Sequence, residues 1–346
     1  MLQSLSTKWG GYKKTPSSNK RINWIDSSRG LAFLMVIYSH LEYCNPFIMH
    51  FFSPVFLTTF FFVSGYLFKS HCSFEKVFEQ RTRTLLWPLL SLGTIMIIMQ
   101  HLLTFKEAPV PWIESFKGLL YQNGENTLLW FVAAIYIYSI IFYWIERFSG
   151  KYLFVVCILL FVTNWIYSRT NGPTFPWHIA SAGYGCAYMG LGKLYRQYED
   201  KIENTIKTYH IVGAFAMYIM IILLLNRSCS FSGSRWLLDS IVLTGTGLFV
   251  IVEASKRFPI ANSKFLLFIG ANTLFYFAFH GKGYSLIQTS VNKILSILNI
   301  THTGLLDTII GFVIVLLDAL LLIYPAIFVN RYCPWILGKG FKLWKT

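Results

Sequence analysis

The sequence has few charged residues for its size. They make up 13% of 346 residues, whereas soluble globular domains carry about 25%. Hydrophobic residues make up 55%, and the mean hydropathy is +0.51. So few charges cannot cover a globule of this size in water, and long apolar runs recur along the whole chain. The chain is therefore predicted to be an all-α, polytopic membrane protein. Disordered chains, disulfide-stapled secreted modules and outer-membrane barrels are excluded, the last because barrel strands alternate apolar and polar residues.

Motifs for metals and nucleotides are also missing. The six cysteines have no C-x-x-C spacing, and the eight histidines form neither an i, i+4 pair nor H-E-x-x-H. The sequence contains no P-loop and no glycine-rich dinucleotide fingerprint. We therefore expect no metal site and no permanently bound cofactor. No N-terminal signal peptide is evident, since residues 1–23 are polar and basic.

Acidic residues are scarce relative to basic ones. The sequence contains 15 Asp and Glu and 30 Lys and Arg, which gives a net charge of +15. In a soluble protein this would indicate nucleic-acid binding. In a membrane protein, this excess of positive charge fits the positive-inside rule. A lipid bilayer is therefore the expected partner, and nucleic acid is not. The apolar runs predict about ten transmembrane helices, at 25–44, 48–68, 85–104, 127–145, 152–168, 176–193, 208–226, 236–253, 264–281 and 305–329. With the N-terminus inside, inner segments carry 22 Lys and Arg and outer segments carry 7, so both termini are predicted to be cytoplasmic.

The predicted organisation is a single membrane domain with two tails. Residues 1–23 form a cytoplasmic N-terminal tail, 24–330 the ten-helix domain, and 331–346 a basic cytoplasmic tail suited to an anionic inner leaflet. No internal repeat and no attached soluble domain is apparent. Any chemistry must therefore be carried by the membrane domain.

Three ionisable residues of the first predicted helix fall on or near one face. Arg29 and His40 are 11 residues apart, which is three turns plus about 20°, with an axial separation of about 16 Å. Asp26 lies within about 40° of the same face and forms an i, i+3 pair with Arg29. Charges at membrane depth are costly and therefore mark functional sites. The spacing suits an extended ligand that runs along the helix from Arg29 to His40.

The second predicted helix ends in Ser64-Gly65, a pair that permits close backbone approach. A segment predicted to be a cytoplasmic loop then contains Arg81 and Arg83, and Pro88 follows. By composition this is a positive-inside loop. Its arginines could equally hold phosphate groups in bidentate pairs.

Together these segments resemble the acyltransferase-3 family of integral membrane acyltransferases. The family's first helix is similar to D-x-x-R-G-L-A followed by an apolar run to a histidine, which Asp26, Arg29 and His40 match. Its second helix resembles Phe61-Phe62-Val63-Ser64-Gly65-Tyr66-Leu67, and an arginine pair precedes its third helix, although here the pair reads Arg-x-Arg instead of having two residues between. Leu129-Trp130-Phe131 and the segment 270–280, which ends in His280, also look similar. The likeness runs from about residue 21 to 330, and the short chain looks most like the sugar O-acetylating branch.

The resemblance implies a function. Such enzymes move an acyl group, here expected to be acetyl with succinyl open, from cytoplasmic acyl-CoA as co-substrate to a hydroxyl of a glycan or lipid-linked sugar acceptor. It implies that His40, Arg29 and Asp26 are catalytic. His40 would act as a general base or form a transient acyl-histidine. Donor binding is assigned to the residues nearest the basic face: Arg81, Arg83, Arg29 and Ser64.

Acceptor binding is assigned to polar residues expected near the outer side: Glu42, Trp130, Asn126 and His280. Asp318, in the middle of the tenth predicted helix, is expected to face the protein interior and to need a partner.

The expected location is the plasma membrane, the inner membrane of a bacterium. The alternatives are a secondary transporter or flippase, a membrane O-acyltransferase of the other large type, and an inactive scaffold. No inverted halves typical of transporters are found.

Overall fold

The computed structural model of this chain describes residues 22–70, 72–103, 111–121, 129–170, 172–173, 175–225, 230, 236–300 and 303–340. Every regular element in these ranges is a helix. Five helical runs among them are long and apolar enough to cross a bilayer, and a bent pair would make a sixth. The prediction of an all-α polytopic membrane protein is therefore confirmed. The number ten and the cytoplasmic side of both termini stay predictions.

The helices of the first half are α2 (Asn23–Ser39), α3 (Pro46–Phe52), α4 (Phe56–Tyr66), α5 (Phe74–Arg81), the π-helical η1 (Thr82–Leu86), α6 (Trp87–Leu103), α7 (Trp112–Tyr121), α8 (Trp130–Ser149), the short η2 (Gly150–Tyr152) and α9 (Leu153–Tyr167). Those of the second half are η3 (Pro176–Ser181), α10 (Ala182–Gln197), α11 (Glu199–Thr205), α12 (Thr208–Leu225), α13 (Leu237–Arg257), η4 (Pro259–Asn262), α14 (Lys264–Ala271), α15 (Thr273–Ile297), α16 (Gly304–Leu321), α17 (Ile323–Tyr332) and η5 (Pro334–Leu337).

The first predicted helix ends earlier than expected. α2 stops at Ser39 and His40 is its C-cap, so the predicted end at residue 44 was wrong. The chain then turns because Asn45 caps a new helix: its side chain accepts a hydrogen bond from the Phe47 amide at 2.9 Å. The second predicted helix is split into α3 and α4 near Pro54, whose missing amide hydrogen interrupts a helix.

The arginine pair lies on a helix and not in the predicted loop. Arg81 ends α5 and Arg83 lies in η1, and α5, η1 and α6 form one run from Phe74 to Leu103. Within η1 the Trp87 amide donates to the carbonyl of Thr82, five residues back. Pro88, which has no amide hydrogen to donate, follows directly, and single π turns of this kind often occur at functional sites.

The ninth predicted helix is broken and longer than expected. α14 ends at Ala271, Asn272 interrupts it, and α15 continues to Ile297. His280 therefore lies inside α15 and is 1% exposed, not at an outer helix end as predicted. The Asn272 side chain donates to the Phe268 carbonyl at 2.8 Å, which satisfies a carbonyl near the end of α14.

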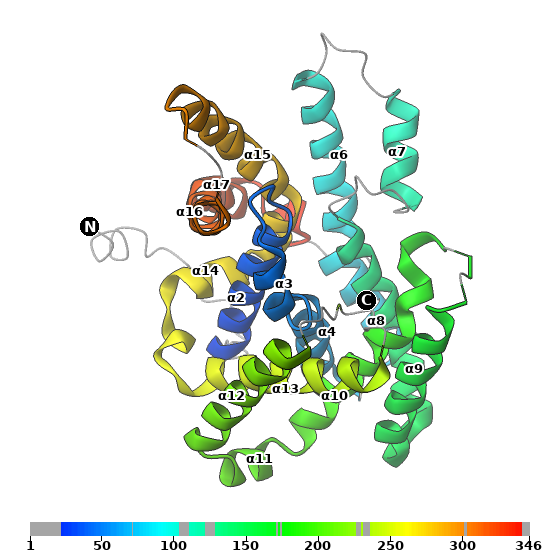
Figure 1. The fold of residues 1–346 in the computed structure, drawn as a ribbon. Helices are drawn as coiled ribbons and strands as arrows, with labels where there is room; N and C mark the ends of the chain where they lie inside the picture. The colour runs from blue at the N-terminus through cyan, green and yellow to red at the C-terminus, as the bar shows by residue number, and fades with distance from the viewer. Residues whose placement is uncertain are drawn as a thin grey trace.

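α2 runs through the middle of the molecule (Figure 1), packed against α4, α13, α14, α15 and α16. Its contact with α14 is made backbone to backbone. A Cβ atom on Gly270 would overlap the Asp26 carbonyl, and one on Gly30 would overlap the Leu266 carbonyl. Small residues allow such close approach between membrane helices, and here they fix α2, which carries Asp26, Arg29 and His40.

We expect Gly270→Ala to destabilise the protein by about 1–3 kcal/mol, because the added methyl group must push α14 away from α2. The matched control is Gly245→Ala in α13, where a Cβ would meet open space. Alanine there should be neutral or stabilising by up to about 1 kcal/mol. Thermal unfolding of both variants in the same detergent checks this. Equal transition temperatures would contradict the proposed helix contact.

Candidate functional site

A cavity of about 270 Å³, with both polar and apolar walls, lies between α2, η1, α8 and the α14–α15 break. Three cationic side chains line it: Arg29 from α2, Arg81 from α5 and Lys339 from the C-terminal segment. Asp26 is the acidic residue in its lining and is buried. Thr84, Asn272 and Thr273 add further polar groups. With three cations against one carboxylate, the cavity favours a polyanion.

Lys339 was not predicted as a site residue. The sequence assigns it to a basic tail, but η5 packs that segment against α6: the Trp87 indole donates to the Trp335 carbonyl at 2.8 Å, and the Ser91 hydroxyl donates to the Ile336 carbonyl at 2.7 Å. Gly338 follows at φ +67°, a conformation that favours glycine, and its Cα lies against the Arg83 backbone. The chain thus returns to the rim of the cavity.

A line of amide side chains holds Lys339 at this position. The Lys339 ammonium donates to the Asn330 side-chain oxygen, and the Asn330 amide donates to the Asn272 oxygen at 2.7 Å. This connects the C-terminal segment to α17 and to the helix break. Only the fold reveals the connection, because the three residues are separated by up to 67 positions in the sequence.

Another part of the cavity's lining is aromatic. Phe60, Phe131 and Phe277 line it, with ring centroids 5.2–5.4 Å apart in every pair. The Phe277 ring also contacts Phe33 at 4.8 Å and the ring of His280 at 6.4 Å. Phe277 therefore separates the cationic cavity from the histidine side of the molecule.

Behind this aromatic wall the rings of His40 and His280 meet edge to face, with centroids 5.3 Å apart. His40 is exposed at the end of α2, whereas His280 is buried. The sequence predicted both as site residues, and the structure brings them together. Nothing in their separation of 240 positions indicated that they would be in contact.

The hydrogen bonds of both histidines determine which nitrogen carries the proton. His40 Nδ1 lies 2.8 Å from the Val36 carbonyl, and His280 Nδ1 lies 3.0 Å from the Tyr276 carbonyl. A carbonyl oxygen can only accept, so in the neutral rings each Nδ1 donates and each Nε2 offers a lone pair. Nε2 of His280 is buried and has no hydrogen-bond partner among the described residues. Both rings can therefore accept a hydrogen bond at Nε2.

Glu42, two residues after His40, is held against α15. Its backbone amide donates to the Gln288 oxygen at 3.2 Å, and the Asn292 amide donates to its carboxylate at 3.2 Å. The Tyr43 hydroxyl donates to the Asn292 oxygen. These bonds fasten the turn that follows His40, the C-cap of α2, to α15.

Other predicted residues lie elsewhere. Ser64 is buried in α4 beside the close contact with α10, and Arg83 is two residues beyond Arg81; neither is among the described residues that line the cavity. Trp130 contacts the ring of His178 at 4.4 Å, although its neighbour Phe131 does line the cavity. Asn126 lies outside the described residues.

Asp318 faces the protein interior, as expected, and is fully buried. Its carboxylate lies directly against Gly283 of α15, where a Cβ atom would overlap it. The expected partner is not found: in the described part of the chain neither carboxylate oxygen has a hydrogen bond. The described residues also contain no group of three or more His, Cys, Asp and Glu that could hold a metal ion.

A model of the acyltransferase-3 family, described as an acyltransferase domain, matches residues 22–327. The match covers most of the chain and includes both the cavity-lining part of α2 and the histidine pair. No curated protein and no solved structure gives a significant match.

The cationic cavity predicts that Lys339→Ala weakens binding of a polyanion such as ADP about tenfold, the value of one charge-assisted hydrogen bond. Lys264→Ala is the matched control, because this exposed lysine of α14 does not line the cavity. Calorimetric titration of the purified protein measures both. An equal effect of the two substitutions would show that ADP responds only to overall charge.

Proposed function

The chain belongs to the acyltransferase-3 family, and we propose that it transfers an acyl group, in the first instance acetyl, from acyl-CoA to a hydroxyl group of a cell-envelope sugar. The observation that supports this most directly is the arrangement along α2. A cationic cavity lies at one end of this helix, and a histidine with a free Nε2 lone pair lies at the other. A donor with phosphate groups and a long flexible arm fits such a separation.

Donor binding is proposed for the cavity. The CoA phosphates pair with Arg29, Arg81 and Lys339, and Asp26 orients Arg29 from the preceding turn of α2. At about 270 Å³ the cavity lies at the lower end of small-molecule sites, so it admits the slender part of the donor and leaves the nucleotide at its rim. In the predicted orientation this rim faces the cytoplasm, where acyl-CoA is found.

The thioester then has to reach His40 through the aromatic wall. Phe277 stands between the cavity and the histidine rings, so its side chain must turn aside for the pantetheine arm to enter. The opening that it leaves limits the size of the acyl group that passes. This supports a small acyl group such as acetyl.

The chemical step uses the His40 Nε2 lone pair. Nε2 takes the proton of the acceptor hydroxyl as its oxygen attacks the thioester carbon; the C–O bond forms, the C–S bond breaks, and the proton passes to the departing CoA thiolate. Attack by Nε2 itself, giving a transient acyl-histidine, uses the same atom and the same geometry.

His280 supports a sugar as the acceptor. Its buried Nε2 requires a hydrogen-bond donor, and its ring lies against that of His40. A sugar carries hydroxyl groups on neighbouring carbons, so one can donate to His280 while the next reacts at His40. Glu42, exposed in the turn that follows His40, is proposed to accept a further hydroxyl group. The plasma membrane, the inner membrane of a bacterium, is the proposed location because it separates cytoplasmic acyl-CoA from envelope sugars.

The proposal predicts that His40→Ala lowers acetyl transfer by about 10²–10⁴-fold while acetyl-CoA binding is retained, because general base catalysis is worth that much. Inverted membrane vesicles are given radiolabelled acetyl-CoA on their exposed cytoplasmic face, and label is followed into lipid-linked and polymeric glycan. Full transfer by a normally expressed His40→Ala protein would overturn the catalytic assignment. Absence of both transfer and acetyl-CoA binding in wild type would favour the transport alternative.

The aromatic wall predicts a change in acyl-chain selection. Phe277→Ala removes the ring between cavity and histidines, so the ratio of kcat/KM for hexanoyl-CoA to that for acetyl-CoA should rise about tenfold or more, the order expected for a few methylene groups in an apolar passage. Phe161→Ala, at a buried phenylalanine of α9 that does not line the cavity, controls for general loosening of the core. An unchanged ratio in Phe277→Ala would show that the thioester takes another route.

A further inference from the structure

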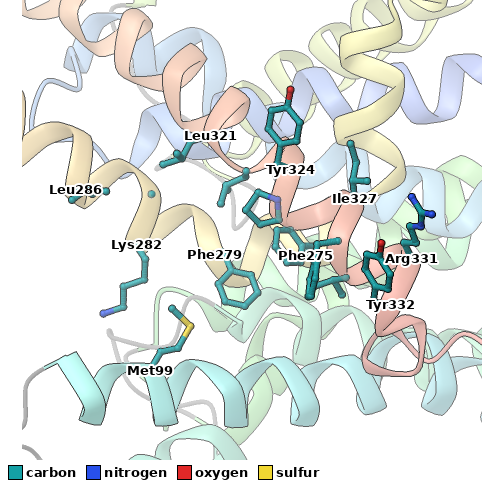
Figure 2. A pocket seen from close by; sticks show the side chains of 15 residues that line it. Met99, Phe275, Phe279, Lys282, Leu286, Leu321, Tyr324, Ile327, Arg331 and Tyr332 are labelled. Atoms are coloured by element: carbon teal, nitrogen blue, oxygen red, sulfur yellow. The ribbon is translucent and has the colours of Figure 1, made fainter. Parts of the chain in front are cut away.

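α15 presents different faces to two parts of the molecule. One face lines an apolar groove of about 800 Å³ between α6, α15 and the α16–α17 segment, and Figure 2 shows Lys282 and Leu286 on that side of the helix. His280 and Tyr284 do not line the groove. At 100° per residue Lys282 is 200° from His280, so the histidine and Tyr284, one turn later, belong to the face turned away from the groove.

The proposed transfer needs a hydrogen-bond donor that the histidine pair does not supply. When a hydroxyl group attacks a thioester, the carbonyl oxygen gains negative charge, and enzymes stabilise that charge with donors already in place. Nδ1 of His40 and of His280 is engaged with a backbone carbonyl, so Nε2 of each neutral ring can only accept. Arg29 lies about 16 Å from His40 along α2 and is too distant to act as this donor.

Three hydrogen-bond donors near His40 are already committed to other acceptors. The Ser39 hydroxyl donates to the Val36 carbonyl at 2.7 Å. The Tyr43 hydroxyl donates to the Asn292 oxygen, and the Asn292 amide donates to the Glu42 carboxylate at 3.2 Å. None of these groups can turn to a substrate without breaking a bond that holds the backbone or the turn after His40.

Tyr284 carries an uncommitted hydroxyl one helical turn after His280. The two rings are in contact, with centroids 5.9 Å apart, and Tyr284 is half-buried. Among the described residues no group forms a hydrogen bond with its hydroxyl. Tyr276, one turn before His280, differs in this respect, because its hydroxyl donates to the Ala319 carbonyl at 2.8 Å.

The Tyr284 hydroxyl also faces the turn that follows His40. It lies within electrostatic range of the Glu42 carboxylate, two residues after His40, and of the Asp318 carboxylate on α16. An ionised carboxylate can only accept hydrogen bonds, whereas a phenol keeps its proton at neutral pH and can donate it to a bond. Among these neighbours Tyr284 is therefore the one with a hydrogen left to donate.

We propose that Tyr284 is a catalytic residue and that its hydroxyl donates a hydrogen bond to the carbonyl oxygen of the thioester. This inference rests on the proposed function, to which it adds the oxyanion donor. As the acceptor oxygen bonds to the thioester carbon, the electron pair of the C=O π bond moves onto the carbonyl oxygen. That oxygen accepts the hydrogen bond, and the phenol keeps its proton. When the C–S bond breaks, the C=O bond forms again.

The first test observes this hydrogen bond without a reaction. Acetyl-carba(dethia)-CoA, in which a methylene group replaces the thioester sulfur, cannot be cleaved, and its isotope-labelled carbonyl is followed by difference infrared spectroscopy on the purified full-length protein. We expect the carbonyl stretch to move to lower frequency on binding to wild type. Tyr284→Phe keeps the ring against His280 but should lose most of this shift while the analogue still binds.

Tyr218→Phe is the matched control. Tyr218 belongs to α12, lines neither cavity, and donates its hydroxyl to the Phe51 carbonyl at 2.7 Å, so the substitution also removes one tyrosine hydroxyl and its hydrogen bond. It should retain the full infrared shift.

The second test is kinetic. In the radiolabelled acetyl transfer assay, Tyr284→Phe should lower kcat about 10²–10³-fold, the effect of one oxyanion donor, and leave KM for acetyl-CoA unchanged. Tyr218→Phe should stay within about twofold of wild type in both constants. A higher KM with unchanged kcat in Tyr284→Phe would show a contact made already in the ground state and would overturn the assignment.

Binding of the analogue separates this inference from the proposed function. If the analogue binds and its carbonyl stretch is the same in wild type and Tyr284→Phe, Tyr284 is not the oxyanion donor, and the acyltransferase proposal stands. If the analogue does not bind to wild type, the donor site of the proposed function is wrong and the assignment of Tyr284 fails with it.

Discussion

The close packing of α2 against α14 is the constraint on which the rest of the site depends. Gly30 and Gly270 let the two backbones touch, and the contact holds the helix that carries Asp26, Arg29 and His40 in the centre of the bundle. In a bilayer, helices gain little from burying apolar surface against each other, because lipid is equally apolar. Van der Waals contact between closely approaching backbones supplies the stability instead, and it also defines where the α14–α15 break, with Asn272, lies relative to Arg29.

Placing several cations in one cavity costs free energy, because like charges repel each other. Contacts in several parts of the fold offset this cost. Arg29, Arg81 and Lys339 come from three separate segments, and each segment is anchored by other contacts: α2 by its glycines, α5 by its continuity with α6, and the C-terminal segment by η5. The polyanionic donor of the proposed function would neutralise charges that the fold has already brought together. Such preorganisation improves affinity because the cost of assembling the charges is not met again on binding.

The membrane fold and part of the candidate site could be predicted from local sequence patterns, and the rest of the site could not. Hydropathy predicted the helical membrane fold, and helical spacing placed Asp26 and Arg29 near one face of α2, where both line the cavity. Both predictions depend only on residues that are close together in the sequence. Lys339, Asn272 and Phe277 were missed as site residues because their roles depend on contacts between distant segments. The helix ends at Ser39 and Asn272 were also missed, since apolar character continues through both positions while the backbone turns.

In the proposed acyl transfer, the separation of the cationic cavity from the histidine pair would serve to protect the thioester. A thioester beside an imidazole base is open to attack by any hydroxyl, and water is the most abundant one. In the proposed mechanism, Phe277 keeps the base apart from the cavity to which donor binding is assigned. Exclusion of water from the reacting groups is one way in which enzymes prevent such side reactions. The same ring is packed against Phe33 of α2 and against His280, so it cannot turn aside without changing its contact with the ring that lies beside His40.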